Sequence, residues 1–273
     1  MPRWVSRLSM QVVLISASGI ALLPIYFMVV SSLKQREEYL ADTWGLPEGL
    51  YLENFLTSLG QEATAGRFLN SIILTVGSVA ISTLLASLAA FAFARLRVPG
   101  KRTLFNFILA LMVVPPVVMV VPLFVTMASL KLVNTYQGVI LIYVGLLLPF
   151  SIYLLSNFFE TIPGAIVDAA RIDGCSNLGV FWRIMLPLSA PALITLVVVN
   201  AMWVWNELLI ALVFLQRDEL KTVMVGVSAM RSRYYLDIPA TMAGLLIATL
   251  PIVLLYLFGQ RFFIRGLVSG AVK

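Results

Sequence analysis

The chain has 273 residues, of which 60% are hydrophobic and 12% are charged, and its mean hydropathy is +0.98. A soluble domain is about 45–50% apolar and about 25% charged, so this composition excludes an ordinary soluble protein and indicates one embedded in lipid. The net charge of +6 does not indicate nucleic-acid binding, because no basic cluster is interleaved with aromatic side chains.

Six long apolar runs divide the chain, and only the fifth contains a charged residue, Glu207. A bilayer core of about 30 Å needs roughly 20 helical residues, so every run is long enough to cross it. None alternates as the strands of a membrane barrel do. The sequence predicts an all-α membrane protein with one domain, residues 1–273. The predicted transmembrane helices are 8–33, 68–94, 103–130, 132–159, 190–216 and 238–260.

The first run has a rival interpretation as a cleavable signal peptide, since Ser16, Ala17 and Ser18 are small enough for a cleavage site. The apolar sequence continues to Leu33, however, well beyond a signal core of about 7–15 residues. We therefore expect the first run to be a membrane helix.

The second run carries small residues at helical spacing, Ser71, Thr75, Ser78 and Ser82, and alanines continue the line at Ala86 and at Ala89 or Ala90. Small residues let two helices approach closely in lipid, so this stripe predicts helix packing in preference to substrate contact.

The third run contains Pro115, Pro116 and Pro122, which predict a kinked or partly unwound segment. Because freed carbonyls need protein or water around them, we expect a translocation path beside this helix.

Basic residues in the short loops predict the orientation. Eleven lie on one side, with three acidic residues: Arg3, Arg7, Arg95, Arg97, Lys101, Arg102, Arg171, Arg183, Arg261, Arg265 and Lys273, against Glu160, Asp168 and Asp173. This side is predicted to be cytoplasmic, with both termini on it. The polar segment 160–191 between the fourth and fifth helices falls on the same side.

Segment 160–191 predicts two short amphipathic helices. Pro163 suits the first turn of one helix, Gly174 ends it, and Ser176 caps the next, which Pro187 ends. In the first helix Ile162, Ala165, Ile166, Ala169 and Ile172 share a face, with Asp168 and Arg171 on another; in the second the apolar stripe is Leu178, Phe181, Trp182 and Met185. From these residues alone, a docking surface and a helix pair lying on lipid headgroups are equally good interpretations.

The order of residues in this segment resembles the EAA loop of ABC-importer permeases. The residues that carry the resemblance are Asp168, Ala169, Ala170, Asp173, Gly174, Phe181, Leu186 and Pro187. Asp168 replaces the usual glutamate and Cys175 a common alanine, so a salt bridge from Asp168 has a shorter reach. The resemblance implies that this loop is a cytoplasmic coupling helix pair that seats in an ATPase subunit.

Further stretches are similar to the carbohydrate-uptake branch of these permeases, and to the smaller, G-type subunit of maltose-like importers. They are residues 87–101, 135–138, 205–207 and 270–273. The resemblance implies a multi-pass protein of the bacterial plasma (inner) membrane. The implied partners are a second homologous permease, a dimer of ATPase subunits that bind ATP and Mg, an extracytoplasmic sugar-binding protein and a sugar substrate. It also implies that Gly270, Ala271, Val272 and Lys273 contact the ATPases, whereas a tail that only fixes topology is an equal alternative.

Asn200, Trp203 and Glu207 recur on one face of the fifth helix, with Asn206 alongside. Amides, a carboxylate and an aromatic ring suit a sugar, so these four residues form a candidate substrate path. The alternative is that Glu207 lies near the outer interface and extends into water, with the tryptophans in the aromatic belt.

No catalytic or cofactor motif is present. Gly100-Lys101-Arg102-Thr103 lacks the upstream glycine and the hydroxyl residue of a phosphate-binding loop, so we expect no ATP hydrolysis by this chain and no enzymatic activity. Histidine is absent and Cys175 is the only cysteine, which argues against a metal site and rules out an intrachain disulfide. The alternative functions are a permease for another small solute, a channel or secondary transporter that uses Glu207, and a membrane scaffold.

Overall fold

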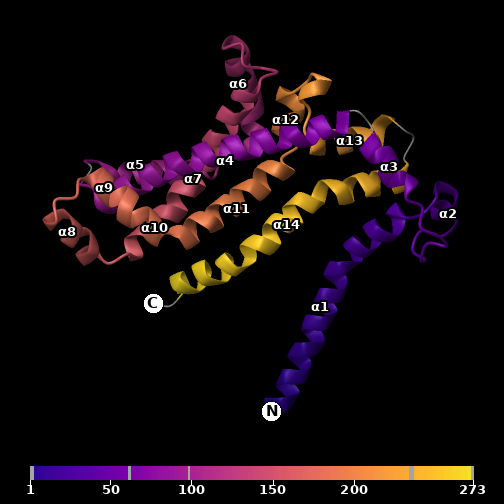
Figure 1. Ribbon diagram of the computed structural model, residues 1–273, viewed down its shortest axis with the longest axis horizontal. Coiled ribbons are helices and arrows are strands. Elements are labelled where there is room, and N and C mark those ends of the chain that lie inside the picture. Colours follow the sequence, from indigo (N-terminus) through magenta and orange to yellow (C-terminus); the bar gives the residue numbers. More distant parts are fainter. Residues whose placement is uncertain (1–2, 61–62, 98, 234–236, 272–273) are drawn as a thin grey trace. The chain divides into compact units, whose positions relative to one another are not determined.

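The computed structural model describes residues 3–60, 63–97, 99–233 and 237–271, and these contain helices and no strand (Figure 1). The helices are α1 Arg3–Ser32, α2 Arg36–Ala41, α3 Glu53–Gly60, α4 Ala63–Arg95, α5 Lys101–Leu111, α6 Pro116–Ser129, α7 Tyr136–Thr161, α8 Gly164–Ile172, α9 Asn177–Val180, the π-helix η1 Phe181–Met185, α10 Leu186–Leu188, α11 Ala190–Asn206, α12 Leu209–Phe214, the 3-10 helix η2 Asp218–Leu220, α13 Val223–Arg233 and α14 Ile238–Ala271.

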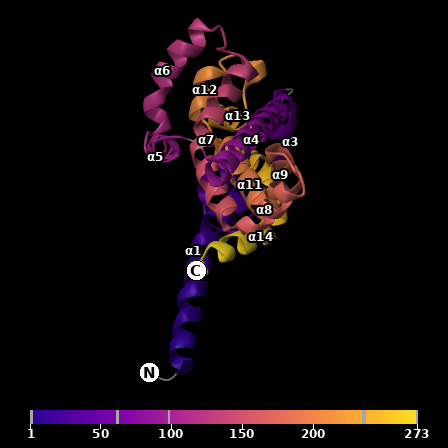
Figure 2. The same cartoon turned by 90° about the vertical axis from the view of Figure 1, so that its left-hand side faces the viewer.

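Four described helices are long and apolar enough to cross a membrane: Ser9–Ser32, Thr64–Arg95, Tyr136–Thr161 and Ile238–Gln260. Two bent pairs also qualify if each pair is one span. Lys101–Leu111 and Pro116–Ser129 meet at 99°, and Asn177–Leu188 and Ala190–Asn206 meet at 76°. Figure 2 shows α6 turning away from α5. The described chain therefore has between four and six candidate spans.

The helix boundaries differ from the predicted ones in three runs. The run 103–130 contains the break that its prolines predict: Pro115 adopts an extended ψ of 135° and a new helix starts at Pro116, while Pro122 lies inside α6. The run 190–216 stops at Asn206, where Glu207 has an extended ψ of 124°. The last helix continues past residue 260 to Ala271, because the charge that ends the apolar run does not end the helix.

The chain divides into two compact units, one formed by residues 1–65 and 226–250 and the other by residues 66–225 and 251–273. In the first unit, side-chain hydrogen bonds hold the segment after α1 in a compact fold. The side chain of Asn54 on α3 donates to the carbonyls of Ser32 and Lys34, each at 2.9 Å, and the fully buried Lys34 ammonium donates to the Asp42 carbonyl. Backbone N–H groups of Gly45 and Trp44 in turn bind the Asp42 carboxylate and lower its pKa.

The second unit has two apolar clusters, one at each end of the same helices. The first contains Ala86, Ala90 and Phe91 of α4, Ile152, Leu155 and Phe159 of α7, and Val167, Ala170, Val180, Phe181 and Met185 of segment 160–191. The second contains Leu74 and Val79 of α4, Val139, Ile142, Tyr143 and Leu147 of α7, and Ala201, Val204, Ile210 and Phe214 farther along. Segment 160–191 is therefore part of a packed core.

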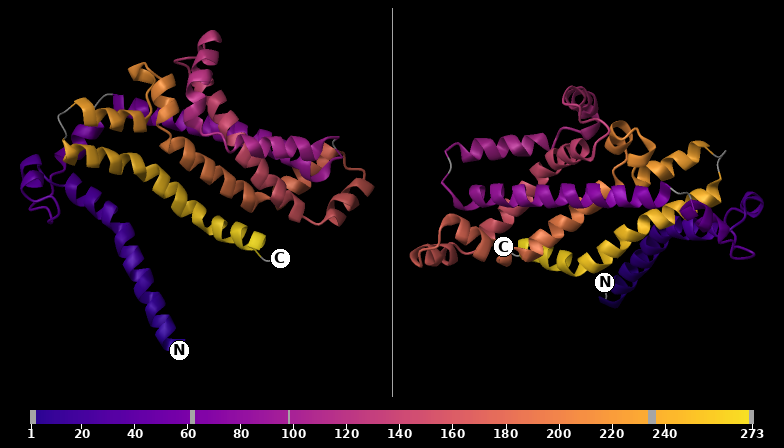
Figure 3. Two further views of the ribbon diagram at one scale, coloured as in Figure 1. Left: turned by 180° about the vertical axis from the view of Figure 1, so that it is seen from behind. Right: turned by 45° about the horizontal axis from the view of Figure 1, so that its top comes forward.

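The small-residue stripe of α4 is buried, as predicted for helix packing. Ser71, Ser78, Ser82, Ala86 and Ala90 are each at most 3% exposed. Helices α7 and α11 pack side by side (Figure 3). Helix α5 contacts α4 through Phe105 and Phe93, whose ring centroids are 5.4 Å apart.

Candidate functional site

Segment 160–191 folds locally as its turn residues predict. Pro163 is the N-cap of α8, directly before its first turn, and Gly174 ends the turn after α8 with φ of +82°. A side chain with a Cβ is strained at this φ, which accounts for glycine there. The Ser176 hydroxyl accepts a hydrogen bond from the Gly179 N–H at 3.2 Å and caps α9.

The apolar face expected on the first helix is divided, because Ile162 is 7% exposed and belongs to the core while other members are exposed. Val167 and Ala170 are 2% and 7% exposed, whereas Ile166 and Ile172 of the predicted face are 41% and 86% exposed. Helix α8 has only nine residues, and it packs through the side that faces Phe181 and its neighbours in the core. The remaining apolar face is left in contact with solvent.

The predicted stripe of the second helix is divided between two environments. Phe181 and Met185 are fully buried, while Leu178 is 63% and Trp182 is 54% exposed. The turn from Phe181 to Met185 is π-helical and wider than an α-helical turn. We call the exposed set Ile166, Ile172, Leu178 and Trp182, together with Asp168 and Arg171, the docking face. Asp168 and Arg171 form an exposed ion pair at 3.7 Å, and such a pair stabilises little by itself.

The other residues of the EAA-like pattern fall into two groups. Asp168, Ala169, Asp173, Gly174 and Pro187 are exposed, and Leu186 is half-buried. Ala170 and Phe181 are buried in the core and support the fold of the segment. The EAA-like pattern therefore includes residues exposed on the surface and buried residues that support the fold beneath them.

The last turns of α4 hold this segment in place. The Arg95 guanidinium donates from Nη2 to the carbonyls of Phe159 and Ile162, at the end of α7. One turn earlier, the ring of Phe91 packs against that of Phe181 with centroids 5.5 Å apart. Sequence reasoning placed Arg95 in the charge count for topology and in the stretch 87–101 that carries the family resemblance, and no sequence signal marked these contacts.

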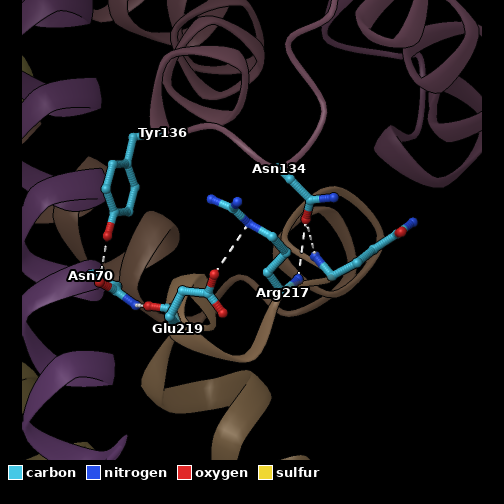
Figure 4. A network of polar contacts seen from close by, with 6 residues as sticks. Asn70, Asn134, Tyr136, Arg217 and Glu219 are labelled. Carbon is cyan, nitrogen blue, oxygen red and sulfur yellow. Dashed lines mark hydrogen bonds and ion pairs between the residues drawn. The ribbon is translucent and has the colours of Figure 1, made fainter.

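The opposite end of α4 is held by a polar network (Figure 4). The Asn70 amide donates to the carbonyls of Glu219 and Lys221 at 2.8 and 2.9 Å and accepts from the Tyr136 hydroxyl at 2.7 Å. Asn134, in a left-handed conformation with φ of +60°, accepts the backbone N–H groups of Gln216 and Arg217. The segment 215–222 is thereby fixed to α4 and to the start of α7.

Two of the four candidate substrate residues line one cavity. It has a volume of about 530 Å³ and lies against α5, α6, α7 and α11; Asn200 and Trp203 line it together with apolar side chains such as Met112, Met119 and Met127. Asn200 is 1% exposed and its amide donates to the Ser151 hydroxyl at 3.0 Å. Trp203 packs edge-on against Tyr143. The cavity is mostly apolar.

Glu207 is half-buried and does not line this cavity. Its carboxylate accepts hydrogen bonds from the Tyr143 hydroxyl at 2.8 Å and from the backbone N–H groups of Ile210 and Ala211 at 2.9 and 3.1 Å. It thus closes the break between α11 and α12. Asn206 is exposed and bonds to the Met202 carbonyl. Tyr143 and Ser151 are polar residues within an apolar run, but the sequence does not indicate which residues they contact.

The structure describes two of the four C-terminal residues of the predicted site. Gly270 and Ala271 belong to the backbone of α14. Val272 and Lys273 lie outside the described residues.

Comparison with known proteins gives this arrangement its context. Residues 82–268 match the profile of the family described as "Binding-protein-dependent transport system inner membrane component". The chain belongs to this family. As a permease of the inner membrane it is a transport component and not an enzyme, and ATP hydrolysis is the work of a separate subunit.

Individual relatives of the permease align along almost its whole length. It is 35% identical to the ABC transporter permease protein YurM of Bacillus subtilis over 250 residues, which is 92% of this chain and 83% of YurM. It is 31% identical to the melibiose/raffinose/stachyose import permease protein MelC of the same organism over 269 residues, 97% of each chain.

A solved structure also has the same fold as the permease. It is a bacterial ABC transporter involved in the import of the acidic polysaccharide alginate, with a TM-score of 0.82, 23% sequence identity and coverage of 95% of this chain and 96% of that chain. At this identity the likeness concerns the fold alone.

Proposed function

We propose that this permease carries a sugar or oligosaccharide into the cell, with energy from ATPase subunits that dock on segment 160–191. It would form the translocation path with a second homologous permease and receive its solute from an extracytoplasmic binding protein. ATP and Mg would be bound by the ATPase subunits. In this proposal there are six membrane spans, and both termini and segment 160–191 lie in the cytoplasm.

The observation that carries the proposal is the docking face. Large apolar side chains that point away from their own chain on a packed, charged helix pair favour a protein partner. Segment 160–191 also carries five charged residues, which suit a polar cleft better than lipid tails: Glu160, Asp168, Arg171, Asp173 and Arg183. The headgroup alternative would leave the EAA-like pattern of Asp168 to Gly174 without a role.

The sugar substrate is inferred from the relatives. MelC is named for the import of melibiose, raffinose and stachyose, and the structural neighbour takes part in alginate import. The apolar cavity beside Asn200 offers few groups for sugar hydroxyls, so we propose that any sugar contact of this chain is made through Trp203 and the Asn200 amide. A different small solute is the second candidate, since a relative of 32% identity, the permease protein GgtD of Synechocystis, is named for the uptake of osmoprotective compounds.

The docking proposal is tested by Ile172→Glu, which puts a charge on the most exposed apolar side chain of the docking face. We expect ATPase subunits to be lost from the purified complex and ATP-driven uptake to fall, while membrane insertion stays normal. The matched control is Leu46→Glu, an exposed apolar residue of the first unit. Normal ATPase retention and uptake with Ile172→Glu would remove the docking proposal.

The solute class is tested separately, with the complete transporter in vesicles and its binding protein supplied. Sugars and oligosaccharides are offered to the binding protein, and ligands that bind are then measured for ATP-driven uptake. Uptake of a sugar supports the proposal. Uptake confined to a solute of another class would correct the substrate and leave the permease assignment unchanged.

A further inference from the structure

Arg95 lies at a junction where three parts of the second unit meet. It is the last residue of α4, and it donates to Phe159 and Ile162 of the neighbouring chain segment. Ile162 is the C-cap of α7, with an extended ψ of 128°, and α8 begins two residues later. The Ile162 carbonyl therefore belongs to the peptide at which the chain turns from α7 into the docking segment.

An arginine suits this position for a physical reason. The last carbonyls of a helix have no partner within the helix and carry the negative end of its dipole. A guanidinium is a permanent cation with several N–H donors in a rigid plane, so one group can hold two carbonyls in a fixed direction. A lysine ammonium keeps the charge but not this fixed geometry.

The same turns of α4 also hold the second half of the docking segment. Phe91 packs on Phe181, which is fully buried among Val167, Ala170 and Met185. A displacement of α8 and α9 is thus opposed at two points by the end of α4. The other end of α4 is bonded through Asn70 to segment 215–222, about 37 Å away for 25 residues at 1.5 Å each.

We propose that Arg95 is a positioning residue that transmits movement of the docking face to α4, and through α4 to segment 215–222. This inference rests on the proposed docking of segment 160–191 on an ATPase. Arg95 touches neither solute nor nucleotide in this role. It fixes the angle between α7 and α8, so that the docking segment and α4 move as one body when the ATPases close.

The test uses the complete transporter with Arg95→Gln, Arg95→Lys and the control Arg97→Gln, which removes an exposed cation two residues away. For Arg95→Gln we expect normal assembly and normal basal ATP hydrolysis. Stimulation of hydrolysis by the loaded binding protein, and uptake per ATP, should fall by about tenfold, the size of a typical coupling energy between sites. Arg95→Lys should recover part of the loss, and Arg97→Gln should behave as the native protein does.

A distance measurement separates this role from one in stability alone. In a Cys175→Ser background, spin labels at Arg97→Cys and Ala165→Cys report on the end of α4 and on α8, and both positions are exposed. We expect a narrow distance distribution in the nucleotide-free and ATP-bound complexes, and a broad one when Arg95→Gln is added. If Arg95→Gln impairs insertion, Arg95→Lys replaces it in this measurement, since it keeps the charge.

Uptake and stimulated hydrolysis within about twofold of native in Arg95→Gln, below the usual range of coupling, would overturn the inference, as would an unchanged distance distribution. This failure is distinguishable from failure of the docking proposal. Loss of the ATPase from Ile172→Glu together with full activity of Arg95→Gln overturns the role of Arg95 alone. Retention of the ATPase and normal uptake in Ile172→Glu overturns docking itself.

Discussion

Glu207 shows how a charged residue can be held within an apolar run without serving the solute. Three donors converge on its carboxylate: the hydroxyl of Tyr143 and the N–H groups of Ile210 and Ala211. These donors come from buried residues that have little access to water. The carboxylate replaces the hydrogen bonds that the broken helix cannot make for itself.

We therefore predict that Glu207→Ala lowers thermal stability more than it alters solute preference. Each buried donor left without a partner costs about 1–3 kcal/mol, so the melting temperature of the purified complex should fall by roughly 5–10 °C. Glu207→Gln keeps one acceptor oxygen, so its melting temperature should fall less. Thermal unfolding and uptake are measured on the same samples. An unchanged melting temperature with abolished uptake would instead assign Glu207 to the solute path.

The contacts of individual residues also explain the motif Thr135-Tyr136-Gln137-Gly138. The Thr135 hydroxyl accepts from the Gly138 N–H at 3.1 Å and donates to the Leu132 carbonyl at 2.7 Å. Tyr136 reaches Asn70 on α4. A Cβ on Gly138 would lie 2.2 Å from the Leu132 carbonyl oxygen, which belongs to the backbone and cannot move aside as a side chain could.

Gly138→Ala should therefore destabilise the permease by about 1–3 kcal/mol, the usual cost of overpacking. The matched control is Gly145→Ala in the same helix, where a Cβ meets nothing within 4 Å. Alanine is the better helix former, so the control should be as stable as the native protein or slightly more so. Equal melting temperatures for the two variants would contradict this account of the motif.

At the scale of elements, the sequence predicted best where one local signal decides the outcome. Gly174 and Ser176 marked the end of α8 and the start of α9 correctly, because a positive φ and a capping hydroxyl are local requirements. Pro115 and Pro116 marked the break in the third run for the same reason. The buried stripe of α4 followed from spacing alone.

Predictions that depended on the neighbours of an element were less successful. The sequence grouped Ile162, Ile166 and Ile172 on one face of the first helix, but Ile162 is buried while the other two are exposed. Val167 and Ala170, outside that group, pack in the core. Helical periodicity shows which residues share a face and not what that face contacts. The partner of Glu207 and the anchor at Arg95 could not be predicted, because Tyr143 and Ile162 are 64 and 67 residues away in the chain.

The junction between α8 and α9 allows a direct test. Gly174→Val places a β-branched residue at φ of +82° and should misplace α9 and the exposed Trp182, so we expect loss of uptake and of bound ATPase with normal insertion. Gly174→Asn, which tolerates a left-handed conformation better, should retain a larger part of both activities. ATPase co-purification and uptake are compared for the two variants. Full uptake with the valine would show that this turn is not needed for coupling.

For the whole molecule, the bent pair α5 and α6 decides the topology. If the pair is one span, three spans separate Leu46 from Ile172, and the two residues lie on opposite sides of the membrane. If the pair enters and leaves on the same side, only two spans separate them. The 99° bend at Pro115 allows either geometry by length and composition.

We predict opposite sides, in keeping with the distribution of basic residues. In a Cys175→Ser background, Leu46→Cys should react with a membrane-impermeant maleimide in spheroplasts, and Ile172→Cys only in inverted vesicles. Both positions are exposed, at 74% and 86%, so access is not limited by the fold. Labelling of both from the same side would establish a re-entrant pair and change the span count to five.

The two apolar clusters of the second unit have a consequence for how such permeases diversify. One cluster supports segment 160–191, and the other surrounds Tyr143 and the broken end of α11. The hydrogen bond from Asn200 to Ser151 joins α11 to α7. Substitutions in one cluster disturb few packing partners in the other. If ATPase subunits dock on segment 160–191 as proposed, selection can change the half of the molecule that holds Trp203 while the fit to the ATPase persists. One energy-supplying subunit can then serve permeases of different solute preference.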